Sequence, residues 1–267
     1  MLSALSPARR RFVGGVLGLV VLSVAVVAGT TVVRAARGGG PDVTPVAQDA
    51  QPPVLLVPGY GGSTSSLEPL AAALRGQGRT VTIVRLAGDG TGDLNLQAGV
   101  LQTAVEATLR GGGDSVDIVG YSAGGVTARL WLRAYDGGSV ARRIVTLGSP
   151  QHGTDLASLA SDLAPDSCPA ACRQLVTDSE LVRSLNAEDE TPDGPRWVSI
   201  WTTDDRVSTP PETASLDGAL DFSVQSVCPA RQLTHGELPT DPAVVRMVLA
   251  ELRRTPPAVP PASVCTA

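Results

Sequence analysis

The segment Ser115–Gly125 restricts the fold of this chain more than any other. A short, mostly apolar run at 116–119 predicts a strand, and the pattern at 126–135 predicts a helix. Between them stands Gly-Tyr-Ser-Ala-Gly, with Ser122 at its centre. Small residues two positions before and after a serine let strand and helix approach closely, on a sharp and strained turn. The segment therefore predicts a nucleophilic serine above a sheet edge; the alternative is an incidental serine in a glycine-rich turn.

The rest of the chain alternates between strand-like and helix-like segments. Short apolar or β-branched runs predict strands at 53–57, 80–86, 116–119, 143–147, 197–201 and 222–227. Helical patterns occupy 64–74, 93–110, 126–135, 173–186 and 241–254. Strands separated by helices form βαβ units, so we expect an α/β fold with a mostly parallel sheet of about six strands, flanked by helices.

The N-terminal residues 1–37 have a different character. Residues 12–33 form an uncharged, mostly apolar run of about 22 residues, close to the roughly 20 that a bilayer-spanning helix needs. Three arginines, Arg9–Arg11, precede the run, which predicts a cytoplasmic N-terminus and an exported remainder. The run is longer than the apolar part of most signal peptides, so we favour an uncleaved signal anchor. A cleaved signal peptide ending near residues 26–28 is the alternative.

The exported part divides into three segments. A Gly- and Pro-rich linker covers residues 38–52, the folded domain covers 53–256, and a proline-rich tail covers 257–267. The net charge of −5 becomes −10 for residues 38–267, because residues 1–37 hold five arginines and no acid. Such an acidic domain is not expected to bind nucleic acid or to dock on anionic lipid. We expect a monomer, attached to the membrane through the N-terminal helix.

The four cysteines form an even set in an exported chain, which favours two disulfides over a metal site. Three pairings are possible. We prefer Cys168–Cys172 within one loop and Cys228–Cys265 joining the tail to the domain. The chain has two histidines, too few for a three-histidine zinc site, and we expect neither a metal nor a cofactor.

The first predicted strand ends in Pro58-Gly59-Tyr60-Gly61-Gly62, a loop suited to presenting backbone amides. Acyl transfer needs N–H donors aimed at a developing oxyanion. We assign them to the amides of Tyr60 and Ala123, with Gly61 as an alternative to Tyr60. A phosphate-binding loop is the competing interpretation, but the lysine and the Ser/Thr of that motif are missing.

A histidine would serve as the base that activates the serine, and the chain offers two. In a sheet of this kind the expected chain order is nucleophile, acid, histidine. His235, in the loop before the last helix, leaves room for an acid on a later strand than Ser122. His152 follows the fourth strand too closely, so we expect it to order its loop by hydrogen bonding.

The acid is expected at the end of a strand. The fifth strand ends at the pair Asp204-Asp205, and a carboxylate there would hold the imidazole tautomer and stabilise the imidazolium. We prefer Asp205, and Asp204 remains an alternative. Asp217 and Asp221 are more distant options.

These motifs resemble those of the α/β-hydrolase lipases and esterases, particularly the small bacterial triacylglycerol lipases. The resemblance spans about residues 53–240, through the segments VLLVPGYGG, VDIVGYSAGG, VTLGSPQHGT, TTDD and LTHGE. It implies an α/β-hydrolase fold and a Ser122–Asp205–His235 triad. The sequence departs from the family at Pro58-Gly59, where these lipases have His-Gly.

The resemblance and the motifs together predict an exported serine hydrolase, a carboxylesterase of the lipase type acting on lipid or short- to medium-chain acyl esters. Residues 155–192 are expected to form a small lid or cap; a plain crossover helix is the alternative. Aromatic residues are scarce, so we expect an aliphatic acyl pocket. Two other functions stay open: a cell-envelope acyltransferase or thioesterase with the same triad, and a non-catalytic binding module on this fold.

Overall fold

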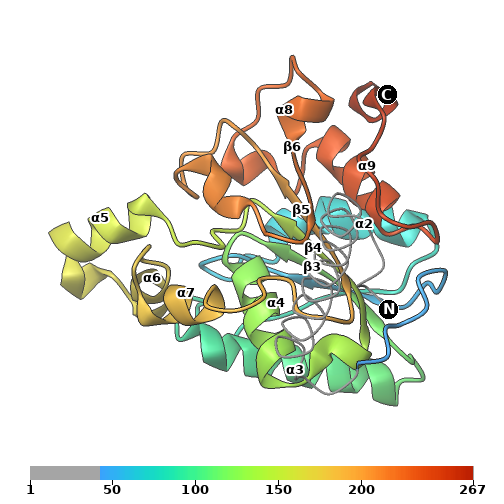
Figure 1. Cartoon of the computed structure of the whole chain (residues 1–267), viewed down its shortest axis with the longest axis horizontal. Coiled ribbons are helices and arrows are strands. Elements are labelled where there is room, and N and C mark those ends of the chain that lie inside the picture. Colours follow the sequence, from blue (N-terminus) through green and yellow to red (C-terminus); the bar gives the residue numbers. More distant parts are fainter. Residues whose placement is uncertain (1–42, 267) are drawn as a thin grey trace, which may run out of the picture. The chain divides into compact units, whose positions relative to one another are not determined.

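The computed structural model describes residues 43–266, and its core is one parallel six-stranded sheet with strand order β2-β1-β3-β4-β5-β6 (Figure 1). The strands are β1 (Val54–Val57), β2 (Val81–Ile83), β3 (Val116–Tyr121), β4 (Ala141–Leu147), β5 (Arg196–Trp201) and β6 (Leu220–Ser223). The α-helices are α2 (Glu68–Gly76), α3 (Leu94–Arg110), α4 (Ala123–Ala134), α5 (Asp155–Leu163), α6 (Ala170–Gln174), α7 (Glu180–Leu185), α8 (Val224–Val227) and α9 (Pro242–Glu251). The predicted parallel α/β architecture is confirmed.

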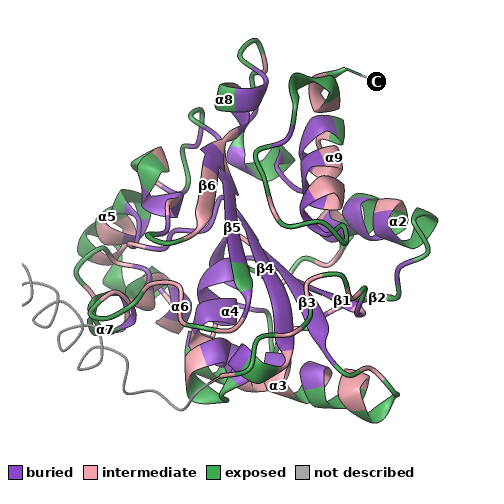
Figure 2. Cartoon of the chain, turned by 45° about the vertical axis from the view of Figure 1, so that its right-hand side comes forward, coloured by how far each residue is buried: buried purple, intermediate pink, exposed green. Residues whose placement is uncertain are grey.

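Helices cover both faces of the sheet, which explains why its central strands are mostly apolar. In β1, Val54 and Leu56 pack into one core with residues of α2 and α9. Leu55 and Val57 point to the opposite core, with residues of α3 and α4. Figure 2 shows the central strands as a buried layer between these helices. Because successive side chains alternate between the faces, a strand buried on both sides is apolar at most positions, and β1 is apolar at all four.

The predicted strand at 222–227 is wrong in its second half. Strand β6 ends at Ser223, and residues 224–227 form the short helix α8. The Ser223 hydroxyl accepts a hydrogen bond from the Ser226 amide at 3.1 Å, which caps that helix. A capping serine gives the backbone an alternative to the strand ladder, so the β-branched residues that follow enter a helical turn.

The predicted helical segment at 173–186 is also divided. Helix α6 ends at Gln174 and α7 begins at Glu180. Ser179 makes the break, because its hydroxyl donates to the Gln174 carbonyl at 2.7 Å and accepts from the Val182 amide at 3.1 Å. One side chain therefore satisfies a backbone carbonyl at the end of one helix and a backbone amide at the start of the next.

Other predicted elements differ by a few residues at their ends, and α2 and β2 are two of them. Residues 65–67 form a 3-10 turn before α2, which then runs two residues past the predicted end at 74. Strand β2 covers only residues 81–83 of the predicted 80–86. It lies at the edge of the sheet and pairs with β1 alone, so only the residues opposite β1 have ladder partners.

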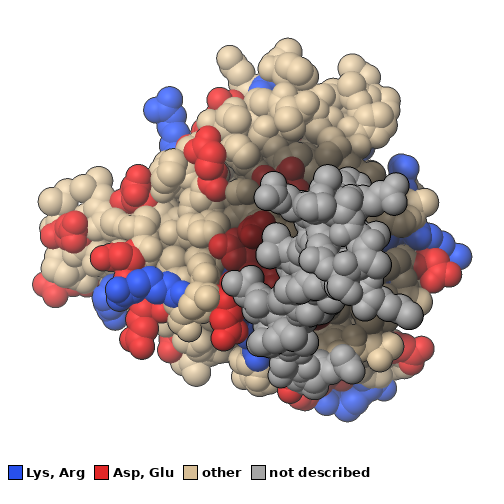
Figure 3. Space-filling model, in the orientation of Figure 1, with Lys and Arg blue, Asp and Glu red and all other residues tan. Residues whose placement is uncertain are grey.

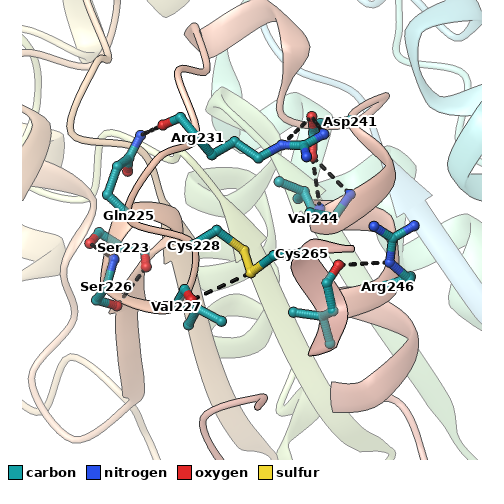
Figure 4. Close-up of a disulfide and its surroundings, with 12 residues drawn as sticks. Ser223, Gln225, Ser226, Val227, Cys228, Arg231, Asp241, Val244, Arg246 and Cys265 are labelled. Carbon is teal, nitrogen blue, oxygen red and sulfur yellow. Dashed lines mark hydrogen bonds and ion pairs between the residues drawn. A yellow bond between two sulfur atoms is a disulfide. The ribbon is translucent and has the colours of Figure 1, made fainter. Parts of the chain in front are cut away.

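Both preferred disulfides, Cys168–Cys172 and Cys228–Cys265, are confirmed. Figure 4 shows the second, which ties the C-terminal tail to the end of α8. The Arg246 Nε atom adds a hydrogen bond to the Val264 carbonyl at 2.7 Å. Disulfides persist in oxidising compartments, so this finding agrees with an extracytoplasmic protein.

A buried ionic cluster closes the sheet at the amino-terminal ends of its strands. Asp117 of β3 is fully buried and accepts from Arg79 at 2.6 Å and from Arg142 at 2.8 Å. Arg142 also donates to the backbone carbonyls of Leu252 and Arg253, at 2.9 and 3.0 Å. Because a buried charge is tolerated only when it is paired and hydrogen-bonded, this cluster fixes the end of α9 against the sheet.

Within residues 43–266, no helix is long and apolar enough to cross a membrane. The predicted membrane-spanning run at 12–33 lies outside the described residues. Acidic side chains are spread over the face drawn in Figure 3, including the region of α5 at the left. Their spread agrees with the acidic charge expected for the domain.

Glu251, at the end of α9, carries a testable pH dependence. Burial raises the pKa of its carboxyl from 4.5 to about 7, although the charge of Arg143 opposes the shift. When folding raises the pKa of a carboxyl, the folded protein loses stability as pH rises. For Glu251 this loss runs from about pH 4.5 to about pH 7. We expect the Glu251→Gln variant to lose less thermal stability than wild type between pH 5 and pH 8. The matched control is Glu188→Gln, at an exposed glutamate; equal pH profiles for all three proteins would contradict the expectation.

Candidate active site

The turn that bears Ser122 is as strained as the sequence predicts. Ser122 has φ 53° and ψ −128°, a conformation that L residues rarely adopt. Two glycines make the turn possible. A Cβ on Gly120 would lie 2.5 Å from the Gly125 Cα, and a Cβ on Gly124 would lie 2.3 Å from the Val57 carbonyl oxygen. Strand β3 and helix α4 therefore cross at a distance that no side chain would permit.

Ser122, His235 and Asp205 form one hydrogen-bonded chain. The His235 Nε2 atom lies 3.0 Å from the Ser122 Oγ, and its Nδ1 lies 2.7 Å from the Asp205 Oδ2. A carboxylate only accepts, so Nδ1 carries the proton and Nε2 is left to accept from the serine hydroxyl. All three residues are buried, with exposed fractions of 8, 6 and 4%. The serine hydroxyl thus faces the imidazole nitrogen that can take its proton.

The backbone on either side holds Asp205 and His235 in place. Asp205 accepts through Oδ1 from the amides of Val207 and Ser208, at 2.8 and 2.9 Å, which leaves Oδ2 for the imidazole. His235 begins a 3-10 turn whose capping box joins Thr234 and Glu237. Both partners of the pair are therefore oriented by bonds other than the one between them.

Tyr121, the last residue of β3, contacts His235, and no motif in the sequence indicates this contact. Its hydroxyl donates to the His235 carbonyl at 3.2 Å, and the two rings lie 5.3 Å apart between centroids. Burial raises the pKa of the Tyr121 phenol to about 12, and the Asp205 charge adds to the shift. The phenol therefore keeps its proton and donates throughout the neutral range.

Asp204 has a different role from its neighbour. Its Oδ2 accepts from the Leu233 amide at 3.1 Å and from the Gln225 side chain at 3.2 Å. Thr202 also bonds the Leu233 carbonyl, at 2.7 Å. Asp204 thus holds the backbone of the loop that carries His235, whereas Asp205 contacts the imidazole.

The two more distant acids lie elsewhere. Asp221 accepts from the Trp201 indole at 3.3 Å, and the Asp217 amide donates to Glu190. His152 bonds the Thr213 carbonyl at 3.2 Å and Glu190 at 2.8 Å. These contacts agree with the loop-ordering role predicted for His152.

The glycine-rich loop after β1 lies directly against the serine, since a Cβ on Gly59 would be 2.8 Å from the Ser122 Cβ. Two of its amides are occupied: Gly61 donates to the Gly90 carbonyl at 3.4 Å, and Gly62 to the Gly59 carbonyl at 3.0 Å. The amides of Tyr60 and Ala123 have no hydrogen-bond acceptor within residues 43–266. Of the two alternatives, Tyr60 therefore has the available donor.

Residues 155–192 follow β4 along the chain and form α5, α6, α7 and their connections (Figure 1). Three leucines of α5 are exposed at 46–76%: Leu156, Leu159 and Leu163. Arg129 of α4 is buried and donates to Asn186 at 2.9 Å and to the Leu185 carbonyl at 3.0 Å, which joins this segment to the helix below Ser122. Burial lowers the pKa of the Arg129 guanidinium to about 10, so it stays charged at neutral pH.

Nothing in the described part of the chain resembles a metal centre, since no group of three or more His, Cys, Asp or Glu side chains converges there. The chemistry that this arrangement can perform is nucleophilic attack by Ser122, with two amides beside it to bind an oxyanion.

Comparison with solved structures identifies the fold. The chain superposes on a Bacillus licheniformis lipase in its mature form with a TM-score of 0.64 and 19% identity, over 80% of this chain and 96% of that one. The chain has the α/β-hydrolase fold. Lipase B of Aspergillus fumigatus gives a TM-score of 0.63 at 17% identity, over 79% and 55% of the two chains. A metagenomic α/β-hydrolase enzyme from sediments of the Mar Chica lagoon, Morocco, gives 0.53 at 18%, over 76% and 90%.

The sequence by itself matches no family model and no curated protein. The predicted resemblance to lipases and esterases of the α/β-hydrolase fold is therefore seen when structures are compared. At identities of 17–19% it establishes the fold alone.

Alanine substitution of two glycines in helices tests the close contact at the turn that bears Ser122. Gly124→Ala would place a methyl group 2.3 Å from the Val57 carbonyl oxygen, whereas a methyl group on Gly76, at the end of α2, would meet nothing within 4 Å. We expect Gly124→Ala to lower the free energy of unfolding by about 2–3 kcal/mol. Gly76→Ala should leave it unchanged or raise it by up to about 1 kcal/mol. Urea denaturation followed by tryptophan fluorescence measures both, and equal losses would contradict the contact argument.

Proposed function

We propose that this protein is an extracytoplasmic serine hydrolase that cleaves carboxylic esters through a covalent acyl-enzyme intermediate. The observation that carries the proposal is the hydrogen-bonded chain from Ser122 through His235 to Asp205, with the amides of Tyr60 and Ala123, which have no acceptor within residues 43–266, beside it. In this proposal the first three residues are the catalytic triad and the two amides form the oxyanion hole.

The first half of the reaction acylates the serine. His235 Nε2 takes the proton of the Ser122 hydroxyl as the oxygen attacks the ester carbonyl. The negative charge that develops on the carbonyl oxygen is bound by the Tyr60 and Ala123 amides, at the N-terminus of α4. Asp205 stabilises the imidazolium, which then gives its proton to the departing alcohol.

The second half regenerates the enzyme. Water replaces the alcohol, His235 Nε2 removes one of its protons, and the hydroxide attacks the acyl-enzyme carbonyl. The tetrahedral intermediate collapses, the acid leaves, and the proton returns to the Ser122 oxygen. Every step uses side chains and amides of this chain, so the mechanism requires no cofactor.

The substrate class proposed is lipid or short- to medium-chain acyl esters. Two of the structural neighbours are lipases by name, which supports an ester rather than a peptide substrate. The exposed leucines of α5 supply an apolar surface in residues 155–192, the segment that we propose as a cap over the site. The two disulfides support a location outside the cytoplasm. Attachment to a membrane through residues 12–33 remains a prediction from sequence.

The nucleophile is tested with residues 38–267, using a fluorophosphonate probe and p-nitrophenyl esters of increasing chain length. We expect the probe to label the wild-type protein and not Ser122→Ala, and ester hydrolysis to fall by a factor of about 10³ or more in that variant. The control is Ser66→Ala, at a partly exposed serine outside the site. Labelling that survives Ser122→Ala, or is absent from the wild type, would overturn the serine-hydrolase proposal.

The two neighbouring aspartates should separate in kinetics. Asp205→Asn removes the acceptor that fixes the His235 tautomer, and we expect kcat to fall by a factor on the order of 10³–10⁴. Asp204→Asn keeps an oxygen for the Leu233 amide and loses only a charge, so kcat should fall less than about tenfold. If kcat falls further in Asp204→Asn than in Asp205→Asn, Asp204 and not Asp205 is the acid that orients His235.

A further inference from the structure

The oxyanion loop, residues 58–62, is held by a segment that follows a different strand. The Gly61 amide donates to the Gly90 carbonyl at 3.4 Å. A Cβ on Gly90 would lie 2.5 Å from the Gly62 nitrogen and 2.7 Å from the Gly62 Cα. The backbones of the two loops are therefore in direct contact, and Tyr60 is the residue immediately before this contact.

The same segment has a compact shape of its own. Gly90 has φ +74°, a conformation that favours glycine. The Asp89 carboxylate accepts from the amide and the hydroxyl of Thr91, at 3.0 and 2.6 Å. Asp93 caps α3 by accepting from the Asn95 amide at 2.9 Å. Residues 89–94, which we call the bridging segment, are thus fixed at both ends by local hydrogen bonds.

The far side of the bridging segment contacts helix α6. The Ala171 amide donates to the Thr91 carbonyl at 3.1 Å. Gln174 makes a two-point contact: its Oε1 accepts from the Leu94 amide at 2.8 Å, and its Nε2 donates to the Asp93 Oδ1 at 2.6 Å. The bond from Gln174 is also the largest cause of the lowered pKa of Asp93.

Helix α6 is itself restrained by a covalent link. The Cys168–Cys172 disulfide joins a residue of α6 to the turn before it, and Cys168 is buried. A continuous series of contacts therefore runs from this disulfide through Gln174 and the bridging segment to Gly61 and Gly62. Residues 155–192 and the oxyanion loop, far apart in sequence, are connected by it.

We propose that the bridging segment sets the position of the Tyr60 amide, and that Gly90, Asp93 and Gln174 are positioning residues for the oxyanion hole. An oxyanion donor acts only at 2.7–3.1 Å from the charge that develops, so a small shift of its loop weakens it. The inference rests on the proposed function for its effect on catalysis. Its structural part, the coupling of α6 to the oxyanion loop, is independent of that function.

Two alanine variants in the same loop distinguish the effect of the contact between Gly90 and Gly62 from the effect of backbone strain. Gly90→Ala and Gly88→Ala both place alanine at a positive φ, of +74° and +61°. A Cβ on Gly88 meets nothing within 4 Å, whereas a Cβ on Gly90 meets the oxyanion loop. Both variants therefore carry the cost of a left-handed alanine, and Gly90→Ala alone displaces residues 61 and 62.

A second pair tests the link to α6. Gln174→Glu places a carboxylate against Asp93, and like charges repel. Adding Asp93→Asn removes this repulsion, because asparagine carries no charge. Its Oδ1 still accepts from the Asn95 amide, so α3 keeps its cap. The double variant should therefore recover what Gln174→Glu loses through repulsion.

The experiment measures amide hydrogen exchange in the peptide covering residues 58–63, together with kcat and KM for a p-nitrophenyl ester. In Gly90→Ala and Gln174→Glu we expect exchange to speed up at least about threefold and kcat to fall on the order of tenfold, with KM little changed. Gly88→Ala and the double variant should remain within about twofold of wild type.

Several results would overturn the inference. One is unchanged exchange at residues 58–63 in both Gly90→Ala and Gln174→Glu. Another is an equal response in Gly88→Ala, which would assign the effect to strain. A third is that exchange and kcat do not recover in the double variant, which would show that the Asp93–Gln174 contact does not couple α6 to the oxyanion loop. If exchange responds as expected while the wild-type protein hydrolyses no ester, the coupling stands and the proposed function fails.

Discussion

The close crossing of β3 and α4 is the constraint on which the rest of the site depends. Gly120 and Gly124 have no side chain, so the helix can approach the strand and the end of β1 within van der Waals contact of the backbone. This approach forces Ser122 into its left-handed conformation and places residues 58–62 against the serine. The proposed nucleophile, the amide after it and the first strand are thus positioned by one glycine-lined contact.

Much of this architecture can be predicted from the sequence, because its signals are local. A parallel strand buried on both faces is mostly apolar, so β1 is visible as an uninterrupted apolar run. The turn at Ser122 is visible because only small residues fit on either side. The position of His235 could be inferred from chain order, and the structure brings it to Ser122 and Asp205.

What could not be predicted depends on contacts between distant residues. The break between α6 and α7 comes from one serine that satisfies two helix ends, and α8 forms because a serine caps it. The separate tasks of Asp204 and Asp205 depend on which backbone amides each faces in the folded state. The bridging segment does leave a trace in sequence, the glycines of Ala-Gly-Asp-Gly-Thr-Gly at 87–92, but its partner, Gly62, is set by the sheet order.

The disulfide between Cys228 and Cys265 has a topological consequence. The sequence separation of 37 residues makes a covalent ring, and the ring includes His235 and the whole of α9. The Arg231–Asp241 ion pair crosses the ring at the base of the histidine loop (Figure 4). A protease that cuts one peptide bond between these two cysteines leaves both products attached. Nicked molecules would therefore keep the histidine segment tethered to the sheet, and reduction is needed before either fragment can leave.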